Sequence, residues 1–532
     1  MVLKIERHNP TLVIDSTGRE VVMPTDDENW KPSKFDMFMS NIWDCFTMPP
    51  VQRHYVNKID FFIFSYSLAS YIVKALDQNN FSNAFVSGMQ TDLQLYGQQR
   101  NLFTTLFNMG YLTGSVPNQI IINRIRPSIW IPICEIMWGI LTMCIAAANS
   151  ATTIYGIRFV SGFFESATFP SFSLILGSWY TPSELGKRIS LFEFSSSAAG
   201  MFSGYIMAGL YATMNGTRGI PAWRWMFIID GVITIPIGII GFFFLPDFPT
   251  SSRAMWLKPW EREFGIRRMA AIGRKPQQKL TLRRLRRLFF GPTLWASFIP
   301  YSANWWLNYT GYFNLWLKSL TNPKFTTEQL NTIPTAGNAL AVISAYVWPT
   351  ISDKTHARWQ FGVLSSAFGL LGSILLSIWH LPMGVLMFAQ LIPNAGASGQ
   401  SLLIAWMQES FQDDTELRSM ITGFGNVINY AMNAWLPLVC YPTYMAPHYK
   451  AGYQTSAGLY ALHIVSVFLF RYYIKWYHKR NNMVLNNFGL PEKWDQISNE
   501  NSAGAVIMRD VNYSNDTEEN EKNEKNVKVD VV

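Results

Sequence analysis

Long apolar segments alternate with short polar ones over most of this 532-residue chain. A helix that crosses the hydrocarbon core of a bilayer needs about 20 mostly apolar residues. The segment WMFIIDGVITIPIGIIGFFFL, residues 225–245, meets this requirement with a single charge, Asp230. Comparable segments predict twelve membrane spans, at residues 59–76, 101–122, 129–148, 151–179, 189–214, 223–245, 292–317, 332–351, 359–379, 381–407, 418–440 and 451–476. The pattern therefore predicts an all-α membrane protein.

The composition agrees with this pattern, since 49% of the residues are hydrophobic and only 15% are charged, which is unlike a soluble protein. No apolar run precedes Ile59, and the first residues lack a basic region followed by an apolar one, so we expect no cleavable signal peptide. The four cysteines are scattered, and they predict neither a disulfide framework nor a metal site. No motif predicts a cofactor.

The predicted spans divide six and six around a polar segment that carries twelve Lys or Arg residues against three acidic ones. We therefore expect a cytoplasmic N-terminal tail (1–57), a six-helix bundle (58–245), a basic cytoplasmic linker (246–292), a second six-helix bundle (293–476) and a cytoplasmic C-terminal tail (477–532). The run LTLRRLRRLFF resembles a nucleic-acid-binding patch. Between two membrane halves, however, such a run is better explained by the positive-inside rule and by anionic lipid headgroups. We expect membrane lipids as partners and no nucleic acid.

Orientation follows from these charges. The linker and the cluster Arg471, Lys475, Lys479 and Arg480 are both expected on the cytoplasmic side. An even number of spans then puts the N-terminus inside as well, so that odd spans run outward. The last stretch, SNDTEENEKNEKNVKVDVV, has too few apolar residues to fold, and we expect it to be disordered.

Two charges lie within the fourth predicted span, in RFVSGFFESATFP, residues 158–170. Arg158 and Glu165 are seven positions apart, so on a helix they share one face. A charge at the middle of a bilayer costs at least about 2.5 kcal/mol. This face should therefore line protein or water and not lipid, and it indicates a cavity. A purely structural ion pair between the two residues is the alternative.

The first predicted span repeats this feature in YIVKALDQNN, where Lys74 and Asp77 are three positions apart and share a face. They form a second charge pair, although snorkelling to the interface would also explain them. Asp230 is a weaker candidate, because it falls near a predicted outer end where capping at the interface would account for it.

The second half of the chain offers uncharged polar groups. The seventh predicted span contains Asn304 and Asn308, and the eleventh contains Asn429. These amides can hydrogen-bond the uncharged part of a ligand. Amides between membrane helices also commonly serve packing, and this alternative stays open.

Six plus six spans with a long central loop resemble the major facilitator superfamily. Between the eighth and ninth predicted spans, PTISDKTHAR resembles the second copy of the loop motif of that superfamily, with Asp353, Lys354 and Arg358 in the expected positions. The resemblance implies a gating role for these three residues. The first copy, PNQIIINRIRPSIW, departs from the motif, because Asn123 stands where an acidic residue is expected.

Several segments resemble the fungal allantoate permease branch of anion:cation symporters, over about residues 58–480: ALDQNNFSNAFVSGMQTDL, RFVSGFFESATFP with LGSWY, and GIPAWRWMFIIDG. Within this branch, NYTGYFNLWLKSL and NAWLPLVCYP look closest to biotin and pantothenate carriers. The resemblance implies import of a small monocarboxylate together with protons across the plasma membrane by a monomer. It leaves the substrate open, because relatives carry nicotinate, allantoate, sulfur compounds or dipeptides.

Together these features predict a secondary active transporter that works by alternating access. We expect the substrate to be bound by Arg158, Lys74, Asn304, Asn308 and Asn429. Glu165 and Asp77 are the candidates for carrying the coupling proton. A membrane enzyme would need a nucleophile, metal cluster or cofactor motif that the sequence does not show, whereas a nutrient sensor on the same fold remains an alternative.

Overall fold

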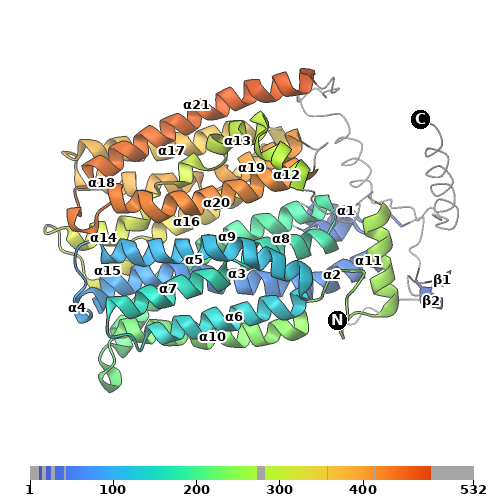
Figure 1. Cartoon of the computed structure of the whole chain (residues 1–532), viewed down its shortest axis with the longest axis horizontal. Coiled ribbons are helices and arrows are strands. Elements are labelled where there is room, and N and C mark those ends of the chain that lie inside the picture. Colours follow the sequence, from blue (N-terminus) through green and yellow to red (C-terminus); the bar gives the residue numbers. More distant parts are fainter. Residues whose placement is uncertain are drawn as a thin grey trace.

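The computed structural model describes residues 11–14, 20–24, 30–40, 43–271, 282–355, 357–411 and 415–480, and it consists mainly of helices (Figure 1). Within these ranges, β structure is confined to one antiparallel pair, β1 (Thr11–Ile14) and β2 (Glu20–Met23), with Thr11 opposite Met23. Only residues 477–480 of the predicted C-terminal tail are described, and they belong to the last helix. The stretch expected to be disordered lies outside the described residues.

The helical elements before the predicted linker are α1 (Lys34–Met39), η1 (Asp44–Thr47), α2 (Pro50–Ile59), η2 (Asp60–Phe64), α3 (Ser65–Ala84), η3 (Phe85–Met89), α4 (Gln90–Asp92), α5 (Gln99–Arg124), α6 (Pro127–Ile145), α7 (Ala151–Glu165), α8 (Thr168–Trp179), α9 (Pro182–Met214), η4 (Thr217–Gly219) and α10 (Ala222–Phe244). The first predicted span is the middle of a helical stretch that runs from Pro50 to Asp92. This stretch begins at Pro50. A proline is well tolerated there, because it lacks a backbone N–H group and the N–H groups of the first helical turn have no partner within the helix in any case.

The predicted linker contains two helices, and the elements from there on are α11 (Pro259–Ala271), α12 (Leu282–Phe289), α13 (Pro292–Ser302), η5 (Ala303–Trp305), η6 (Tyr309–Tyr312), α14 (Phe313–Ser319), α15 (Thr327–Thr332), α16 (Thr335–Thr355), α17 (Arg358–Ile378), α18 (Met383–Leu391), η7 (Ile392–Gly396), α19 (Gly399–Ser410), α20 (Thr415–Cys440), η8 (Thr443–Met445) and α21 (Lys450–Arg480).

Each of the twelve predicted spans falls on one helix or on successive helical segments. By length and hydropathy, six helical stretches of the described chain are long and apolar enough to cross a membrane. Two of the other predicted spans, 292–317 and 381–407, are broken into short helices. In the second of these the break falls at the segment IPNAG, where a proline removes one backbone donor. Broken helices inside a membrane are tolerated where they are buried in protein or line a cavity.

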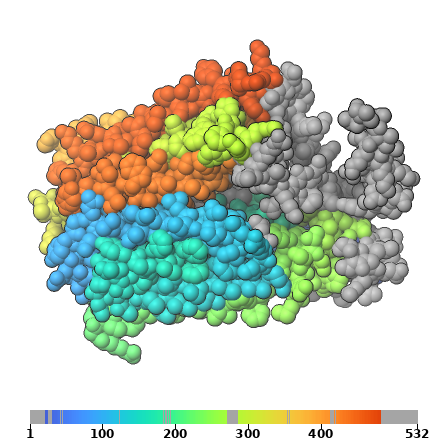
Figure 2. All heavy atoms as spheres, viewed as in Figure 1, coloured from blue at the N-terminus to red at the C-terminus, as the bar shows by residue number. Residues whose placement is uncertain are grey.

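The helices form two halves that lie side by side, coloured blue to green and yellow-green to red in Figure 1. In the first half α3 packs on α9 and α10, α6 on α10, and α5 on α7. In the second half α17 packs on α21 and α19, and α13 packs on α20 and α21. The halves touch through α9 with α15 and α16, and through α5 with α20. On the face shown in Figure 2 their surfaces meet along a continuous boundary.

One end of the molecule, called here the α4 end, holds α4, α14 and α15 (Figure 1). The opposite end, called the α11 end, is held by ion pairs between the first half and the linker helix. Lys58 Nζ lies 2.7 Å from Glu261 Oε2, and Arg268 pairs with Glu184 at the start of α9. Both acidic residues are buried, so the pairs have little solvent screening and fix α11 onto the first half.

Helices α5 and α7 approach each other closely because glycines face the backbone of the opposite helix. A Cβ atom on Gly110 or Gly114 of α5 would collide with the backbone oxygen of Phe159 or Phe163 of α7. A Cβ atom on Gly162 of α7 would collide with the backbone oxygen of Phe107. Small residues at such positions let membrane helices pack backbone to backbone.

We expect Gly162→Ala to destabilise the protein by about 1–3 kcal/mol, because the added methyl group has no room between the two helices. The measurement is the apparent melting temperature of the detergent-solubilised protein. Gly156→Ala is the matched control on the same helix, since a Cβ atom there meets nothing within 4 Å. Equal melting temperatures for the two variants would contradict the close α5–α7 contact.

Candidate functional site

Four charged side chains lie together in the first half. Lys74 and Asp77 come from α3, and Arg158 and Glu165 come from α7. Their exposed fractions are 5%, 1%, 3% and 0% in that order, so none of them reaches the surface. The alternative that Lys74 and Asp77 snorkel to the interface is therefore wrong.

The ion pairs run between the helices and not along them. Arg158 Nη1 lies 3.8 Å from Asp77 Oδ2, and Lys74 Nζ lies 3.9 Å from Glu165 Oε1. The structure therefore contradicts the predicted pair of Lys74 with Asp77, and it also contradicts the alternative of a purely structural ion pair between Arg158 and Glu165. The charges of each helix share one face, and the two faces meet, so opposite charges come together across the helix boundary. Both distances exceed that of a hydrogen bond.

The Arg158 guanidinium has unused hydrogen-bonding capacity. Its Cζ atom lies 5.0 Å from the ring centre of Phe81 and 4.4 Å from that of Phe107, within the range of cation–π interactions. Its Nε and Nη1 atoms are buried and have no hydrogen-bond partner, and neither carboxylate oxygen of Asp77 has one. Native proteins rarely leave buried polar atoms unpaired, so such atoms often mark a functional site.

Lys74 and Glu165 have a different environment. The Lys74 ammonium lies 5.5 Å from the ring centre of Tyr71 and 5.4 Å from that of Tyr111. Glu165 Oε1 accepts a hydrogen bond from Gln78 Nε2 at 2.6 Å, while Oε2 has no partner. The Tyr111 ring stacks on Tyr430 of α20 with 3.7 Å between ring centres, which connects this environment to the second half.

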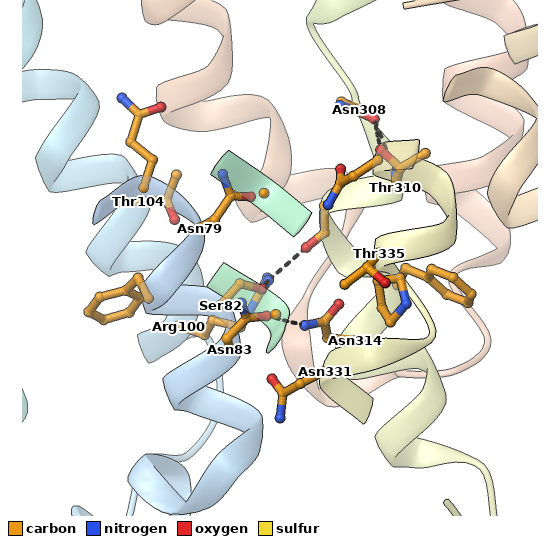
Figure 3. A pocket seen from close by; sticks show the side chains of 18 of the residues that line it. Asn79, Ser82, Asn83, Arg100, Thr104, Asn308, Thr310, Asn314, Asn331 and Thr335 are labelled. Carbon is orange, nitrogen blue, oxygen red and sulfur yellow. Dashed lines mark hydrogen bonds between the residues drawn. The ribbon is translucent and has the colours of Figure 1, made fainter. Parts of the chain in front are cut away.

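A cavity of about 400 Å³ lies between the two halves (Figure 3). Its described lining is mainly polar, with Phe81, Phe107 and Phe313 among the exceptions, and it comes from α3, α5, α7 and α9 on one side and mainly from residues 308–338 on the other. The polar side chains that line it are Gln78, Asn79, Ser82, Asn83, Arg100, Thr104, Asn108, Arg158, Asn308, Thr310, Asn314, Asn331, Thr335, Asn338, Asn394 and Tyr430. The volume is that of a site for a small organic molecule.

The structure brings only part of the expected substrate site to this cavity. Arg158 and Asn308 line it, whereas Lys74, Asn304 and Asn429 are not among its lining residues. Asn304 is buried in η5, and Asn429 Oδ1 accepts a hydrogen bond from Asn433 Nδ2 at 3.1 Å. The helix breaks after α13, so the side chains that follow do not point where one straight helix would direct them. The prediction of one span over residues 292–317 assumes such a straight helix.

Several lining residues were not identified from the sequence, notably Arg100, Asn83, Asn314 and Asn331. The density of amides in ALDQNNFSN and NYTGYFN is a signal that would have found Asn83 and Asn314, whereas Arg100 and Asn331 lie in neither segment. Asn314 Nδ2 donates to Asn83 Oδ1 at 2.6 Å, which links the halves (Figure 3). Asn331 Nδ2 donates to Ser87 Oγ at 2.8 Å.

Asp230 is not an interfacial cap. It is 3% exposed, and its Oδ2 atom accepts a hydrogen bond from Asn80 Nδ2 at 2.9 Å. Asn80 Oδ1 in turn accepts from Ser203 Oγ at 2.6 Å, so the carboxylate belongs to a buried network of α3, α9 and α10. The helix packing places Asp230 inside the bundle, although it lies near the first residues of the predicted span 223–245.

The loop motif lies between α16 and α17. Lys354 is exposed in the last turn of α16, and Arg358 Nε lies 2.7 Å from Glu409 Oε1 of α19. Asp353 is part of α16, but its side chain lies outside the described residues. The gating role of these residues stays a prediction. In the described part of the chain, no group of three or more His, Cys, Asp or Glu side chains is placed to hold a metal ion.

Residues 67–437 match the Major Facilitator Superfamily. The chain is 30% identical over 411 residues to the pantothenate transporter liz1 of Schizosaccharomyces pombe, covering 76% of this chain and 78% of that protein. It is 26% identical over 496 residues to the vitamin H transporter of Saccharomyces cerevisiae, covering 89% and 82%.

Among solved structures, the proton:xylose symporter XylE bound to 6-bromo-6-deoxy-D-glucose matches with a TM-score of 0.60. The match covers 78% of this chain and 96% of that one at 14% identity, so it shows the fold alone. The expected fold class and family are thereby confirmed. The chain belongs to the Major Facilitator Superfamily, and it is a membrane transporter and not an enzyme.

Proposed function

We propose that this protein imports a monocarboxylate vitamin of the pantothenate or biotin type together with a proton, by alternating access at the plasma membrane. The observation that carries this proposal is Arg158, a buried arginine that lines the central cavity and has two guanidinium nitrogens that make no hydrogen bond. A planar guanidinium matches a carboxylate with two parallel hydrogen bonds and stays charged at any physiological pH. The names of the two relatives support this class of substrate.

The remainder of the cavity suits the uncharged part of such a molecule. Its lining is rich in amides from both halves, including Asn79, Asn108, Asn338 and Asn394. Amide side chains both donate and accept hydrogen bonds, so they can pair with the hydroxyl, amide or ureido groups of a vitamin. Because both halves supply these groups, a bound substrate would respond to movement of one half against the other.

Glu165 is the proposed carrier of the coupling proton. It is fully buried, its Oε2 atom has no partner, and it is paired with Lys74, while Asp77 is paired with Arg158. A substrate carboxylate at Arg158 would compete with Asp77 for the guanidinium. Protonation of a carboxylate would remove one negative charge from this cluster when a negatively charged substrate adds one. The charge of the buried cluster would then stay constant during transport.

Alternating access requires the halves to separate at one end while they close at the other. In this structure they are joined at the α4 end, where Asn101 Nδ2 donates to Tyr441 O at 2.7 Å and Thr105 Oγ1 donates to Ala434 O at 2.6 Å. With both termini in the cytoplasm, as the positive charges predict, the α4 end is the outer one. A single chain supplies both halves of the site, so the proposed transporter works as a monomer.

The test of substrate is radiolabelled uptake in a fungal strain that lacks its own vitamin carriers. The panel contains pantothenate, biotin, nicotinate, allantoate and a dipeptide, and growth rescue is scored beside uptake. Saturable uptake of pantothenate or biotin supports the proposal. Uptake of another member alone would replace the substrate class, and binding without uptake would favour a sensor.

We expect uptake to be driven by protons, because the buried cluster contains carboxylates that can take up a proton when the substrate binds. Uptake into vesicles should rise when the outer medium is made more acidic, and a protonophore should abolish accumulation. The control replaces sodium by potassium at constant pH. Dependence on sodium, with no effect of the protonophore, would contradict proton coupling.

A further inference from the structure

Arg100 is a second buried arginine between the two halves. It belongs to the first turn of α5, and only 8% of its surface is exposed. Its Nη2 atom donates to Ser82 Oγ at 3.0 Å in the first half and to Gly311 O at 2.9 Å in the second (Figure 3). The Tyr312 ring, also from the second half, lies 4.5 Å from its Cζ atom. Arg100 therefore helps to hold the halves together at the α4 end.

Among the residues that the structure describes, no carboxylate balances the positive charge of Arg100. In the ranges that the structure describes, its hydrogen bonds go to neutral oxygen atoms, and no Asp or Glu forms an ion pair with it. Arg158 and Arg224, by contrast, each face an aspartate. A buried charge without a counter-ion is costly. If Arg100 served only to join the halves, a neutral donor such as asparagine would do so at lower cost, as Asn101 does beside it.

Arg100 also lies where two cavities meet. It lines the central cavity that contains Arg158. It lines as well a second cavity of about 200 Å³ at the α4 end, formed by Phe85, Gln90, Leu95, Tyr96, Gly97, Thr443 and Tyr444. Tyr96 in this second cavity is 75% exposed, so the second cavity adjoins the surface. A molecule that passes from the surface to the central cavity by this route meets Arg100 first and Arg158 afterwards.

We propose that Arg100 is an entry site for organic carboxylates. When the halves separate at the α4 end, the guanidinium loses Gly311 O and the Tyr312 ring, and the carboxylate of an arriving substrate takes their place. Arg100 then passes the anion to Arg158, and the loss of the anion allows the contact with Gly311 to form again. The inference rests on the proposed function for the identity of the substrate, whereas the attraction of anions by Arg100 is testable without it.

The first experiment measures this attraction directly. Tyr96→Cys is introduced into a chain whose four native cysteines are replaced, and its reaction with an anionic and a cationic methanethiosulfonate reagent is compared at low ionic strength. We expect Arg100→Gln to lower the anionic-to-cationic rate ratio at least about fivefold, since the nearby charge is lost. Arg218→Gln is the control, because Arg218 is an exposed arginine of η4 that lines neither cavity. An unchanged ratio in Arg100→Gln overturns the proposal.

A comparison that leaves Arg100 intact covers the case in which Arg100→Gln does not fold. The same two reagents are applied to Tyr96→Cys and to Thr217→Cys, both in a chain that also carries Arg218→Gln, so that the exposed position 217 in η4 has no arginine beside it. A higher anionic-to-cationic ratio at position 96 supports the entry site, and an equal ratio at both positions overturns it. Pantothenate and biotin should each slow the reaction at position 96 if they pass this way.

The second experiment measures transport. Arg100→Gln should raise the KM for pantothenate or biotin uptake about tenfold, whereas Arg100→Lys, which keeps the charge, should raise it less than threefold. Asn101→Ala removes a neutral contact between the halves at the same end and should leave KM within about threefold. Equal effects of Arg100→Gln and Asn101→Ala would reduce Arg100 to a structural contact and overturn the entry site. If the wild-type chain transports neither vitamin, the proposed function fails, and the thiol reactions still decide the role of Arg100.

Discussion

Arg158→Lys is expected to lower kcat/KM for vitamin uptake about 100-fold while the amount of protein at the cell surface stays nearly unchanged. Lysine keeps the positive charge opposite Asp77, so the ion pair that stabilises the two helices can persist. It cannot reproduce the planar fork that binds both oxygens of a carboxylate. Loss of a hydrogen bond to a charged group costs about 1.5–3 kcal/mol, which corresponds to a change of roughly 10- to 150-fold.

The matched control is Arg224→Lys, because Arg224 also faces an aspartate, Asp92, at 3.3 Å but does not line the central cavity. Surface delivery is measured by labelling of intact cells, and initial uptake rates are divided by the delivered amount. Normal transport by Arg158→Lys would show that this arginine does not bind the carboxylate. A comparable loss in Arg224→Lys would point to a general effect of replacing arginine.

Glu165→Gln is expected to abolish accumulation against a gradient while counterflow of substrate continues. Glutamine preserves the size of the side chain and an oxygen that can accept from Gln78, but it cannot exchange a proton. Net symport requires the proton to return, whereas counterflow only requires the loaded carrier to cross the membrane. Measuring both in the same vesicles separates coupling from binding.

The same substitution also removes the partner of Lys74, and an unpaired buried charge is costly enough to unfold a protein. Glu135→Gln controls for the loss of a buried carboxylate, since Glu135 is fully buried and accepts from Tyr66 Oη at 2.5 Å outside the charged cluster. Only protein that reaches the surface is scored. Full accumulation by Glu165→Gln would assign the proton to another residue, with Asp77 the next to test.

Much of the fold is determined by hydropathy. In lipid every backbone N–H and C=O group must be paired within the protein, so a long apolar segment has to form a helix. The predicted spans consequently fall on helical segments, and the basic segment between them separates the two halves. Hydropathy did not predict where the first helical stretch begins and ends. It begins at Pro50, before the apolar segment, and polar residues such as Asn83 extend it beyond residue 76.

The sequence by itself also identified Arg158, Glu165, Lys74 and Asp77, because a charge within an apolar segment must be buried in protein or lose stability. Only the tertiary structure decided which charges face each other, since pairing depends on how α3 and α7 are rotated, and periodicity within each helix contains no such information. It also decided which amides reach the cavity, because the break after α13 moves Asn304 away and leaves Asn308 in place. For a related reason the sequence did not identify Arg100 as a site residue. An arginine is common at the start of a membrane span, and only the contact of the two halves buries this one.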